Sequence, residues 1–343
     1  MRDFLTLIRL PNLLIIAFTQ YMLRWCLIIP SLNYYKVSFD LELLPKFNLS
    51  ELDFFLLVLS TVMIAAAGYI INDYFDVRID EVNRPRANVV GKTIKRRVAM
   101  GAHMVINIIG AGIGLWLSWK YNQFRAGSFL FITAPALLWF YSTSLKRQFL
   151  IGNVVTSLLS ALVVLLVLLF ELPGVYSKVV QTYPSLIEQK AYSLESILNI
   201  GLAYALFAFL ISLLREMIKD TEDYEGDLAH GCRTVPIVLG IAPTKWIMAG
   251  TAAGVMLMLG WIQLSMAKSS DWTSFTYILL LLQVPLAAVV WLTLKASGKK
   301  DWKKLSWLIK IVMLAGISFL FIYAYTVNKL AAEQLASYAS TTS

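Results

Sequence analysis

Two aspartate-rich stretches lie at the ends of long apolar segments in this chain. The first occupies residues 72–80 and the second occupies residues 220–227. Carboxylates near a bilayer are costly, because an Asp at the centre of a spanning helix costs about 2.5–3.5 kcal/mol on insertion scales. The simplest compensating partner is a hard divalent cation with oxygen ligands. The pattern therefore favours Mg²⁺ that carries a phosphate or a diphosphate.

Helical spacing places the first set of acids on one stripe. At about 100° per residue, Asn72, Asp76 and Asp80 fall at about 0°, 40° and 80° around a helix. Asp73 lies to the side of this stripe.

The second stretch predicts a similar stripe. Asp220, Asp223 and Asp227 fall within about 60° of one another on a helix. Two stripes that face each other across a cavity are suited to two Mg²⁺ ions with a diphosphate between them. The competing interpretation is that these are ordinary solvated acids at the membrane boundary.

Basic side chains near both stretches fit the same ligand. They could balance phosphate oxygens that the metal leaves over, with Arg offering bidentate contacts. Lys146 and Arg147 directly end an apolar segment that contains Tyr141. The full set of basic candidates is Arg84, Arg86, Lys146, Arg147 and Arg215. The alternative is that these cations only reflect the excess of Lys and Arg in cytoplasmic loops.

The composition is that of a membrane protein. The chain has 343 residues, of which 58% are hydrophobic and 15% are charged, whereas soluble domains carry about 25% charged residues. The net charge of +9 is better explained by membrane topology than by nucleic acid, because the cations collect in alternate loops. The two cysteines, Cys26 and Cys232, are not expected to form a disulfide, and no Cys/His metal spacing exists. His103 and His230 are expected not to be ligands.

The elements that must position these residues are membrane-spanning helices. A span needs about 20 apolar residues, and nine segments qualify. They lie at about 10–30, 53–72, 98–119, 127–144, 150–170, 197–215, 245–267, 273–294 and 305–327. The expected fold class is thus all-α, in one transmembrane domain over 1–343 with a frayed tail at 331–343. Arg24 lies inside the first span, either with a functional role or with its head extended to the outer interface.

Charge distribution predicts the orientation. Most Lys and Arg lie in the N-terminal segment and in the loops after the second, fourth, sixth and eighth spans. This bias puts the N-terminus and both acidic stretches on the cytoplasmic side. We therefore expect a multi-pass protein of the cell's inner or plasma membrane.

The two acidic stretches resemble the motifs of a known family. Asn72-Asp73-x-x-Asp76-x-x-x-Asp80 followed by Asn83-Arg84-Pro85 resembles the first motif of the UbiA superfamily of intramembrane prenyltransferases. Asp223-x-x-x-Asp227-x-x-x-Gly231 with Thr234 is similar to its second motif. Within the superfamily, the stretches Asn72–Arg86, Tyr141–Asn153 and Arg215–Gly240 are most similar to the digeranylgeranylglyceryl phosphate synthase branch.

The resemblance implies a fold, an activity and a set of roles. The fold is a bundle of helices around a central cavity, and the reaction moves a geranylgeranyl group from its diphosphate to a glycerol phosphate ether lipid. The implied partners are the prenyl diphosphate, the lipid acceptor and the bilayer, with no nucleic acid and no protein partner. The implied ligands of Mg²⁺ and diphosphate are Asn72, Asp76, Asp80, Asp223 and Asp227. The implied catalytic residues are Lys146, which contacts diphosphate, and Asp73 and Asp220, which support it. The implied substrate-binding residues are Arg84, Arg86, Tyr141, Lys146, Arg147 and Arg215.

Two other functions stay open at this point. An aromatic prenyltransferase that makes a quinone, haem or chlorophyll-type product would use the same metal site. A cation-coupled transporter would use the acids as an ion pathway, although transporter sites usually lie near the bilayer midplane.

Overall fold

The computed structural model of the protein describes residues 2–38, 47–83, 89–183 and 187–342. Within these ranges the chain is almost entirely helical, and an isolated bridge pairs Val90 with Ile94. The longer helices are α2 (Leu10–Met22), α3 (Ile29–Ser38), α4 (Glu51–Asn83), α5 (Arg96–Lys120), α6 (Phe124–Thr143), α7 (Ile151–Thr182), α8 (Ile187–Glu222), α11 (Ile241–Lys268), α13 (Val284–Lys295) and α14 (Lys299–Thr342). The short elements are α1 (Arg2–Leu7), η1 (Leu23–Ile28), η2 (Leu145–Arg147), α9 (Tyr224–Ala229), α10 (Val235–Leu239), α12 (Trp272–Ile278) and η4 (Leu279–Gln283).

Nine helical segments of the described chain are long and apolar enough to cross a membrane, which confirms the predicted number. The first, Leu10–Ser38, joins α2, η1 and α3 end to end. The eighth, Trp272–Lys295, joins α12, η4 and α13 in the same way. Both η1 and η4 are single π-helical stretches inside these spans.

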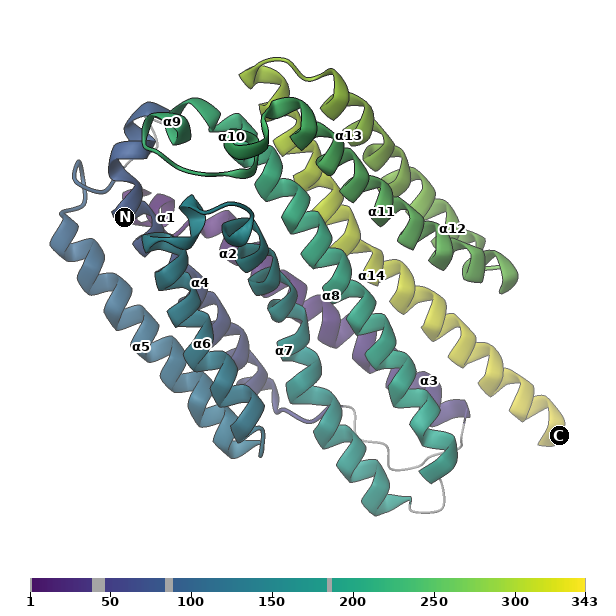
Figure 1. The fold of residues 1–343 in the computed structure, drawn as a ribbon. Coiled ribbons are helices and arrows are strands. Elements are labelled where there is room, and N and C mark those ends of the chain that lie inside the picture. Colours follow the sequence, from purple (N-terminus) through teal and green to yellow (C-terminus); the bar gives the residue numbers. More distant parts are fainter. Residues whose placement is uncertain (1, 39–46, 84–88, 184–186, 343) are drawn as a thin grey trace.

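The bundle has two main hydrophobic clusters. One lies among η1, α4, α6 and α7, where Phe54, Phe131 and Phe170 are buried. The other lies among α8, α11, α13 and α14 and includes Met248 and Leu286. Helix α8 contributes to both clusters, so it packs between the two groups of helices (Figure 1).

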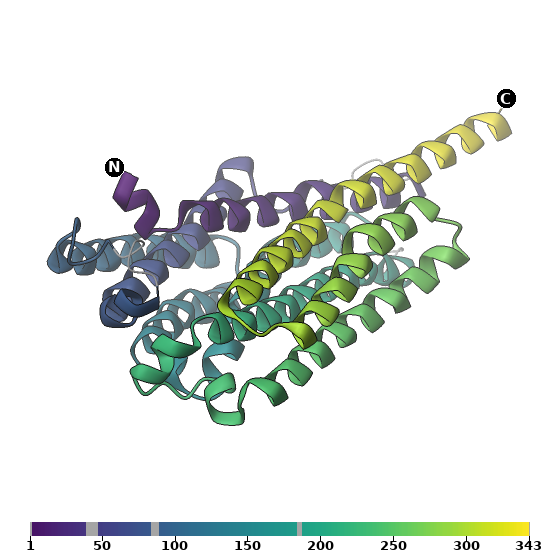
Figure 2. The same cartoon turned by 90° about the horizontal axis from the view of Figure 1, so that it is seen from above.

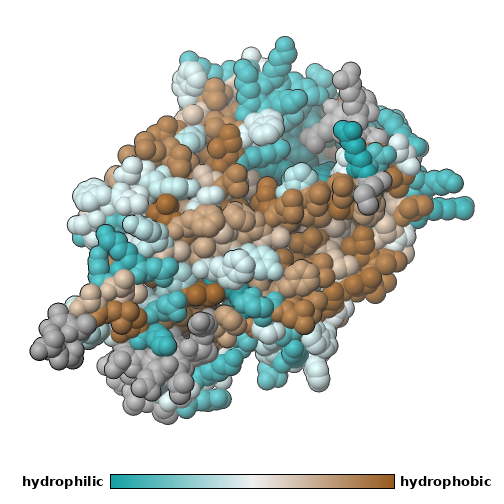
Figure 3. Space-filling view, turned by 180° about the vertical axis from the view of Figure 1, so that it is seen from behind, coloured by the Kyte–Doolittle hydropathy of each residue, from teal (hydrophilic) through white to brown (hydrophobic). Residues whose placement is uncertain are grey.

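The outer surface is apolar as well. Large side chains such as Trp261, Leu257 and Ile108 are more than two-thirds exposed, at 78%, 76% and 71%. Figure 3 shows apolar surface across the middle of the molecule and more hydrophilic surface toward its ends. Such a surface is stable when lipid tails surround it, since lipid is as apolar as the side chains themselves.

The acidic end of α4 lies at the same end of the bundle as α9 and α10 (Figure 1). Helix α14 starts near this end, runs the length of the molecule and continues beyond its neighbours (Figures 1 and 2). It is helical as far as Thr342, so most of the segment 331–343, for which a frayed tail was the expectation, belongs to this helix.

The charge inside the first span is fully buried. Arg24 lies in η1, and its Nε is 3.4 Å from Oε1 of Glu171 in α7, whose side chain is also 0% exposed. Its Nη2 donates to the carbonyl of Leu49 at 2.7 Å. The guanidinium is therefore buried and not exposed to solvent, and it joins η1, α7 and the segment before α4.

Candidate active site

The first acidic stretch lies on the last turns of one helix, as its spacing predicts. Helix α4 is unbroken from Glu51 to Asn83, so Asn72, Asp76 and Asp80 follow one another on successive turns. Asn72 Nδ2 donates to Asp76 Oδ2 at 2.8 Å. This bond uses the amide nitrogen of Asn72 and leaves its Oδ1 to accept from a second partner.

That second partner is Lys146, on the short element η2 between α6 and α7. Its Nζ lies 2.5 Å from Asp76 Oδ1 and 3.3 Å from Asn72 Oδ1. The Lys146 side chain is only 10% exposed. Burial lowers the pKa of Lys146, while the adjacent Asp76 carboxylate opposes this shift. Lys146, from the loop between α6 and α7, thus contacts the acidic stripe of α4.

A glycine allows this approach. Helix α7 begins directly after η2, and a Cβ on Gly152 would lie 2.8 Å from Lys146 Cα and 3.1 Å from the Leu145 carbonyl oxygen. These are backbone atoms, which cannot swing aside as the end of a side chain can. A residue without a Cβ is therefore needed for α7 to pack against the turn that carries Lys146.

The second acidic stretch does not form one continuous helical stripe, and that expectation is wrong. Helix α8 ends at Glu222, and Asp223 has φ −94° and ψ 8° before α9 begins at Tyr224. With ψ near 0° the chain leaves the helical path at this residue. Asp220 therefore lies on α8, Asp223 at the junction and Asp227 on α9.

The break brings Asp227 back toward α4, because α9 packs against that helix. Burial, and then the neighbouring Asp223 carboxylate, raise the pKa of Asp227 to about 7. Asp76 repels the Asp227 charge and Lys146 attracts it. The two acidic stretches, far apart in the sequence, thus share one electrostatic environment that includes Lys146.

Asp220 has a separate anchor. Its Oδ2 accepts a hydrogen bond of 2.7 Å from Asn153 Nδ2, at the start of α7. Tyr141 on α6 lies within electrostatic range of Asp76 and Asp220. The Arg215 guanidinium donates to the adjacent Glu216 carboxylate. The structure therefore brings Tyr141 and Asp220 to the site, and it shows Arg215 engaged with its neighbour.

Sequence reasoning missed Arg9. Its Nη2 lies 2.7 Å from Asp73 Oδ1, its guanidinium stacks over the Tyr69 ring at 5.0 Å, and it also attracts the Asp80 charge. Arg9 has a φ of 51° at the break between α1 and α2. The available signal was a cation immediately before the Leu10-Pro11 helix start, on the same membrane side as the acids.

Asn153 was missed too, although it closes the stretch Tyr141–Asn153. Arg84 and Arg86 lie outside the described residues. Cys232 follows α9 with a buried thiol, and burial, together with the Asp227 carboxylate, raises its pKa to about 11. It is thus held in the thiol form beside the second acidic stretch.

The donor atoms suit Mg²⁺ in their chemistry. Over the described ranges, no group of three or more His, Cys, Asp and Glu side chains is arranged to hold a metal ion. The site nevertheless offers hard oxygen donors, which Mg²⁺ prefers, on α4 and α9. Burial raises the pKa of Asp227 first, and the Asp223 carboxylate adds to this shift, so a nearby cation would favour the charged form of both groups. The oxygen donors of these residues therefore suit a hard cation, and Lys146 supplies the positive charge next to the Asp76 carboxylate.

A family model and the known relatives of this chain point to the same group of proteins. Residues 43–314 match the model of the UbiA prenyltransferase family. The digeranylgeranylglyceryl phosphate synthase of Pyrococcus abyssi is 32% identical over 177 residues, which cover 51% of this chain and 52% of that protein. The synthase of the same name from Thermococcus sibiricus is 31% identical over 224 residues, with 65% and 67% covered. The matched region thus spans about half to two-thirds of the length of these relatives.

Solved structures share the fold. A UbiA homologue from Archaeoglobus fulgidus bound to GPP and Mg²⁺ has a TM-score of 0.55 at 15% identity, covering 95% of this chain and 99% of that one. A structure of a digeranylgeranylglyceryl phosphate synthase has a TM-score of 0.54 at 19% identity, covering 94% and 98%. At these identities the likeness concerns the fold alone. Because the family match covers most of the chain and both acidic stretches, this protein belongs to the UbiA prenyltransferase family.

Proposed function

We propose that the protein is a Mg²⁺-dependent intramembrane prenyltransferase that moves a geranylgeranyl group from its diphosphate to the hydroxyl of a glycerol phosphate ether lipid. The observation that carries this proposal is the position of Lys146, whose Nζ contacts Asn72 and Asp76. Lys146 also attracts the charge of Asp227. This is a largely buried cation among carboxylates at one end of a bundle of apolar helices. The names of the relatives, digeranylgeranylglyceryl phosphate synthase, support the choice of acceptor.

The reaction requires one bond to break and one to form. The bond between C1 of the prenyl group and the diphosphate oxygen breaks, and the diphosphate leaves with the bonding electron pair. The acceptor oxygen bonds to C1, and its proton passes to the departing diphosphate. Negative charge develops on the leaving diphosphate, so preorganised cations accelerate the step. Lys146 is the side chain that holds this charge, and the apolar helices around it keep water from the reactive carbon.

Mg²⁺ would supply further neutralisation of the diphosphate charge. Asn72, Asp76, Asp80, Asp223 and Asp227 are the residues that would hold it, and a UbiA homologue from Archaeoglobus fulgidus has been solved with GPP and Mg²⁺ bound. In our proposal the remaining candidates orient the ligands. Asp73 is fixed by Arg9, and Asp220 is fixed by Asn153.

The phosphate of the acceptor needs cations beyond those that hold the diphosphate. Arg84 and Arg86, which follow the first acidic stretch in the sequence, and Arg147, which follows Lys146 on η2, supply such charges. The distribution of Lys and Arg supports a cytoplasmic location for these residues and hence for the site.

The test is product formation by the purified protein in detergent. It receives geranylgeranyl diphosphate and Mg²⁺ with one of three acceptors: the geranylgeranylglycerol phosphate lipid, its dephosphorylated alcohol, or 4-hydroxybenzoate. We expect mass spectrometry to show a digeranylgeranylated product from the phosphorylated lipid and little from the others. Efficient prenylation of the aromatic acid alone would refute the proposed acceptor and favour the aromatic prenyltransferase. Absence of any prenyl transfer, with cation flux in vesicles, would refute the enzyme in favour of the transporter.

A further inference from the structure

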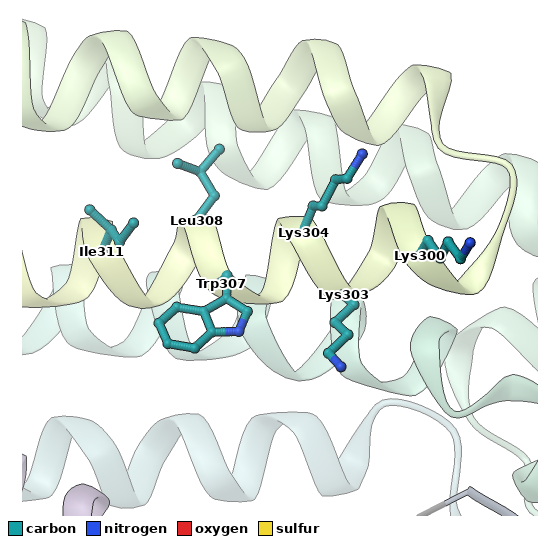
Figure 4. A pocket seen from close by; sticks show the side chains of 6 residues that line it. All are labelled: Lys300, Lys303, Lys304, Trp307, Leu308 and Ile311. Carbon is teal, nitrogen blue, oxygen red and sulfur yellow. The ribbon is translucent and has the colours of Figure 1, made fainter.

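A groove lies on the first turns of α14, away from the acidic stretches. Its volume is about 530 Å³, and its lining residues are Lys300, Lys303, Lys304, Trp307, Leu308 and Ile311. Figure 4 shows the three lysines on the first turns of the helix, with their ammonium groups pointing in different directions, and the three apolar side chains farther along it. None of these residues belongs to the site of prenyl transfer proposed above.

The order of the lining residues follows the depth of the membrane. The ninth apolar span is Lys299–Tyr338, so the lysines lie at its beginning, where a helix enters the bilayer. At 1.5 Å per residue, Ile311 lies about 10 Å farther along the helix axis than Lys304. Trp307 and Ile311 are 63% and 54% exposed. The groove therefore offers cations at the level of lipid headgroups and an apolar surface at the level of acyl chains.

The acid at this helix start is engaged elsewhere. The Asp301 carboxylate accepts hydrogen bonds from the backbone amides of Ser297 and Gly298, at 3.1 and 3.3 Å. It thus caps the helix N-terminus, where an acid is favourable. The Lys310 ammonium lies 5.6 Å from the centre of the Trp307 ring, which adds a fourth cation beside the groove. The local charge is strongly positive and calls for an anionic occupant.

We propose that this groove binds one anionic phospholipid of the surrounding bilayer. The lipid phosphate lies among Lys300, Lys303 and Lys304, and one acyl chain lies along Trp307, Leu308 and Ile311. Charge complementarity selects an anionic headgroup, because Lys side chains near a membrane surface attract acidic lipid. The exposed apolar continuation of the groove selects a lipid over a soluble phosphate, since a free phosphate gains nothing from it.

The test is a titration of the purified protein in detergent with phosphatidylglycerol or phosphatidylcholine, read as one-to-one lipid adducts by native mass spectrometry. We expect phosphatidylglycerol to bind at least about tenfold more tightly than phosphatidylcholine. The variant K300Q/K303Q/K304Q should lose this preference. The matched control K36Q/K178Q/K268Q removes the same number of exposed lysines, taken from other helix ends, and should keep it. Equal loss in both variants would overturn the proposal, because it would show a general effect of net charge.

A second arm tests the apolar half of the groove. Trp307→Ala should weaken phosphatidylglycerol binding several-fold with the lysines intact, and 10 mM inorganic phosphate should not compete. If phosphate displaces the lipid, or if Trp307→Ala binds as the parent does, the site is a simple anion site and the proposal fails. If the triple lysine variant does not fold, the single variant Lys303→Glu, which reverses one exposed charge, replaces it in the comparison of phosphatidylglycerol with phosphatidylcholine. Unchanged lipid preference in Lys303→Glu would likewise refute the proposal.

Discussion

At the scale of single residues, the contact of Lys146 with Asn72 and Asp76 gives a largely buried lysine a nearby carboxylate partner. Burial acts against the ammonium, and the carboxylate at hydrogen-bond distance acts for it. In the proposed reaction, the same ammonium is already in place to meet the charge of the entering diphosphate. No reorganisation of the lysine is then needed at the moment of reaction.

Lys146→Met keeps most of the side-chain volume and removes the charge. We expect turnover to fall by about 100-fold or more, as for loss of one preorganised donor at a developing anion. The measurement is kcat for prenyl transfer with saturating substrates. Lys178→Met, an exposed lysine at the end of α7, is the control and should retain parental turnover. A Lys146→Met enzyme with parental kcat would remove Lys146 from the proposed mechanism.

The raised pKa of Asp227 predicts how Mg²⁺ affinity depends on pH. The carboxyl must lose its proton to bind the metal, and its pKa in the metal-free protein is about 7. Below pH 7 the proton competes with the metal, and above pH 7 it does not. The apparent Mg²⁺ affinity should therefore be about tenfold higher at pH 8 than at pH 6.

Isothermal titration with Mg²⁺ at the two pH values measures this ratio directly. Asp227→Asn cannot titrate at this position, so its affinity, although lower, should change little between pH 6 and pH 8. An equal affinity of the parent protein at both values would contradict the assignment of Asp227 as a ligand.

The residue types of the site were predictable, but some of their partners were not. Asn72, Asp76 and Asp80 share a face because the spacing of one helix sets it. Arg9 and Asp73, in contrast, are 64 residues apart, and Asn153 and Asp220 are 67 residues apart. No periodicity within one segment reports such pairs, because they depend on which helices pack together.

At the scale of elements, the apolar runs predicted all nine spans, since the length of a run and its lack of charge are local properties. The break at Asp223 was not predicted, because the carboxylate spacing alone is compatible with an unbroken helix. The break matters for the site, since it lets α9 pack against α4. The second acidic stretch therefore reaches the first through a change in chain direction.

The position of η2 against α7 depends on Gly152, and Gly152→Ala tests it. The added Cβ would lie 2.8 Å from Lys146 Cα, so the turn must move. We expect turnover to fall by about tenfold to 100-fold, because a misplacement of about 1 Å can cost that much. Gly112→Ala on α5 is the matched control, because a Cβ added at Gly112 would meet nothing within 4 Å. If both variants turn over like the parent, the packing of α7 does not position Lys146.

The buried pair of Arg24 and Glu171 ties η1 to α7 and predicts a stability effect. Glu171→Gln removes the buried charge partner of the fully buried Arg24, and breaking such a buried pair costs about 3–5 kcal/mol. The free energy of unfolding, from denaturant titration in mixed micelles, should fall by about this amount. Glu51→Gln is the control, because Glu51 is 60% exposed and lies 3.5 Å from the same Arg24, and exposed pairs contribute at most about 1 kcal/mol. Equal losses in both variants would mean that burial does not decide the contribution of the pair.

At the scale of the whole molecule, apolar residues occupy both the interior of the bundle and its outer surface. Its helices bury apolar clusters inside the bundle and also expose apolar side chains on the outside. The charged groups of the site are gathered at one end of the bundle. In the proposed reaction, this arrangement lets a prenyl chain lie among apolar helices while its diphosphate stays near the aqueous boundary.

Orientation in the membrane follows from the number of spans and from the loop charges. We expect nine spans to put the two termini on opposite sides, and the excess of Lys and Arg favours a cytoplasmic position for the loop after α4. Helix α14 has 44 residues, a length of about 66 Å, which far exceeds the hydrocarbon thickness of about 30 Å. Its C-terminal end must therefore project into water, where an attached reporter is accessible.

A reporter pair measures this orientation. Alkaline phosphatase, which is active only outside the cytoplasm, should be active when fused after Ser343 and inactive when inserted at Lys92. Green fluorescent protein at the same two positions should give the opposite pattern, which controls for expression. The same compartment for both positions would mean that the number of spans is even. The reverse assignment at both positions would place the acidic stretches on the outer side, and the prenyl diphosphate would then have to be supplied from there.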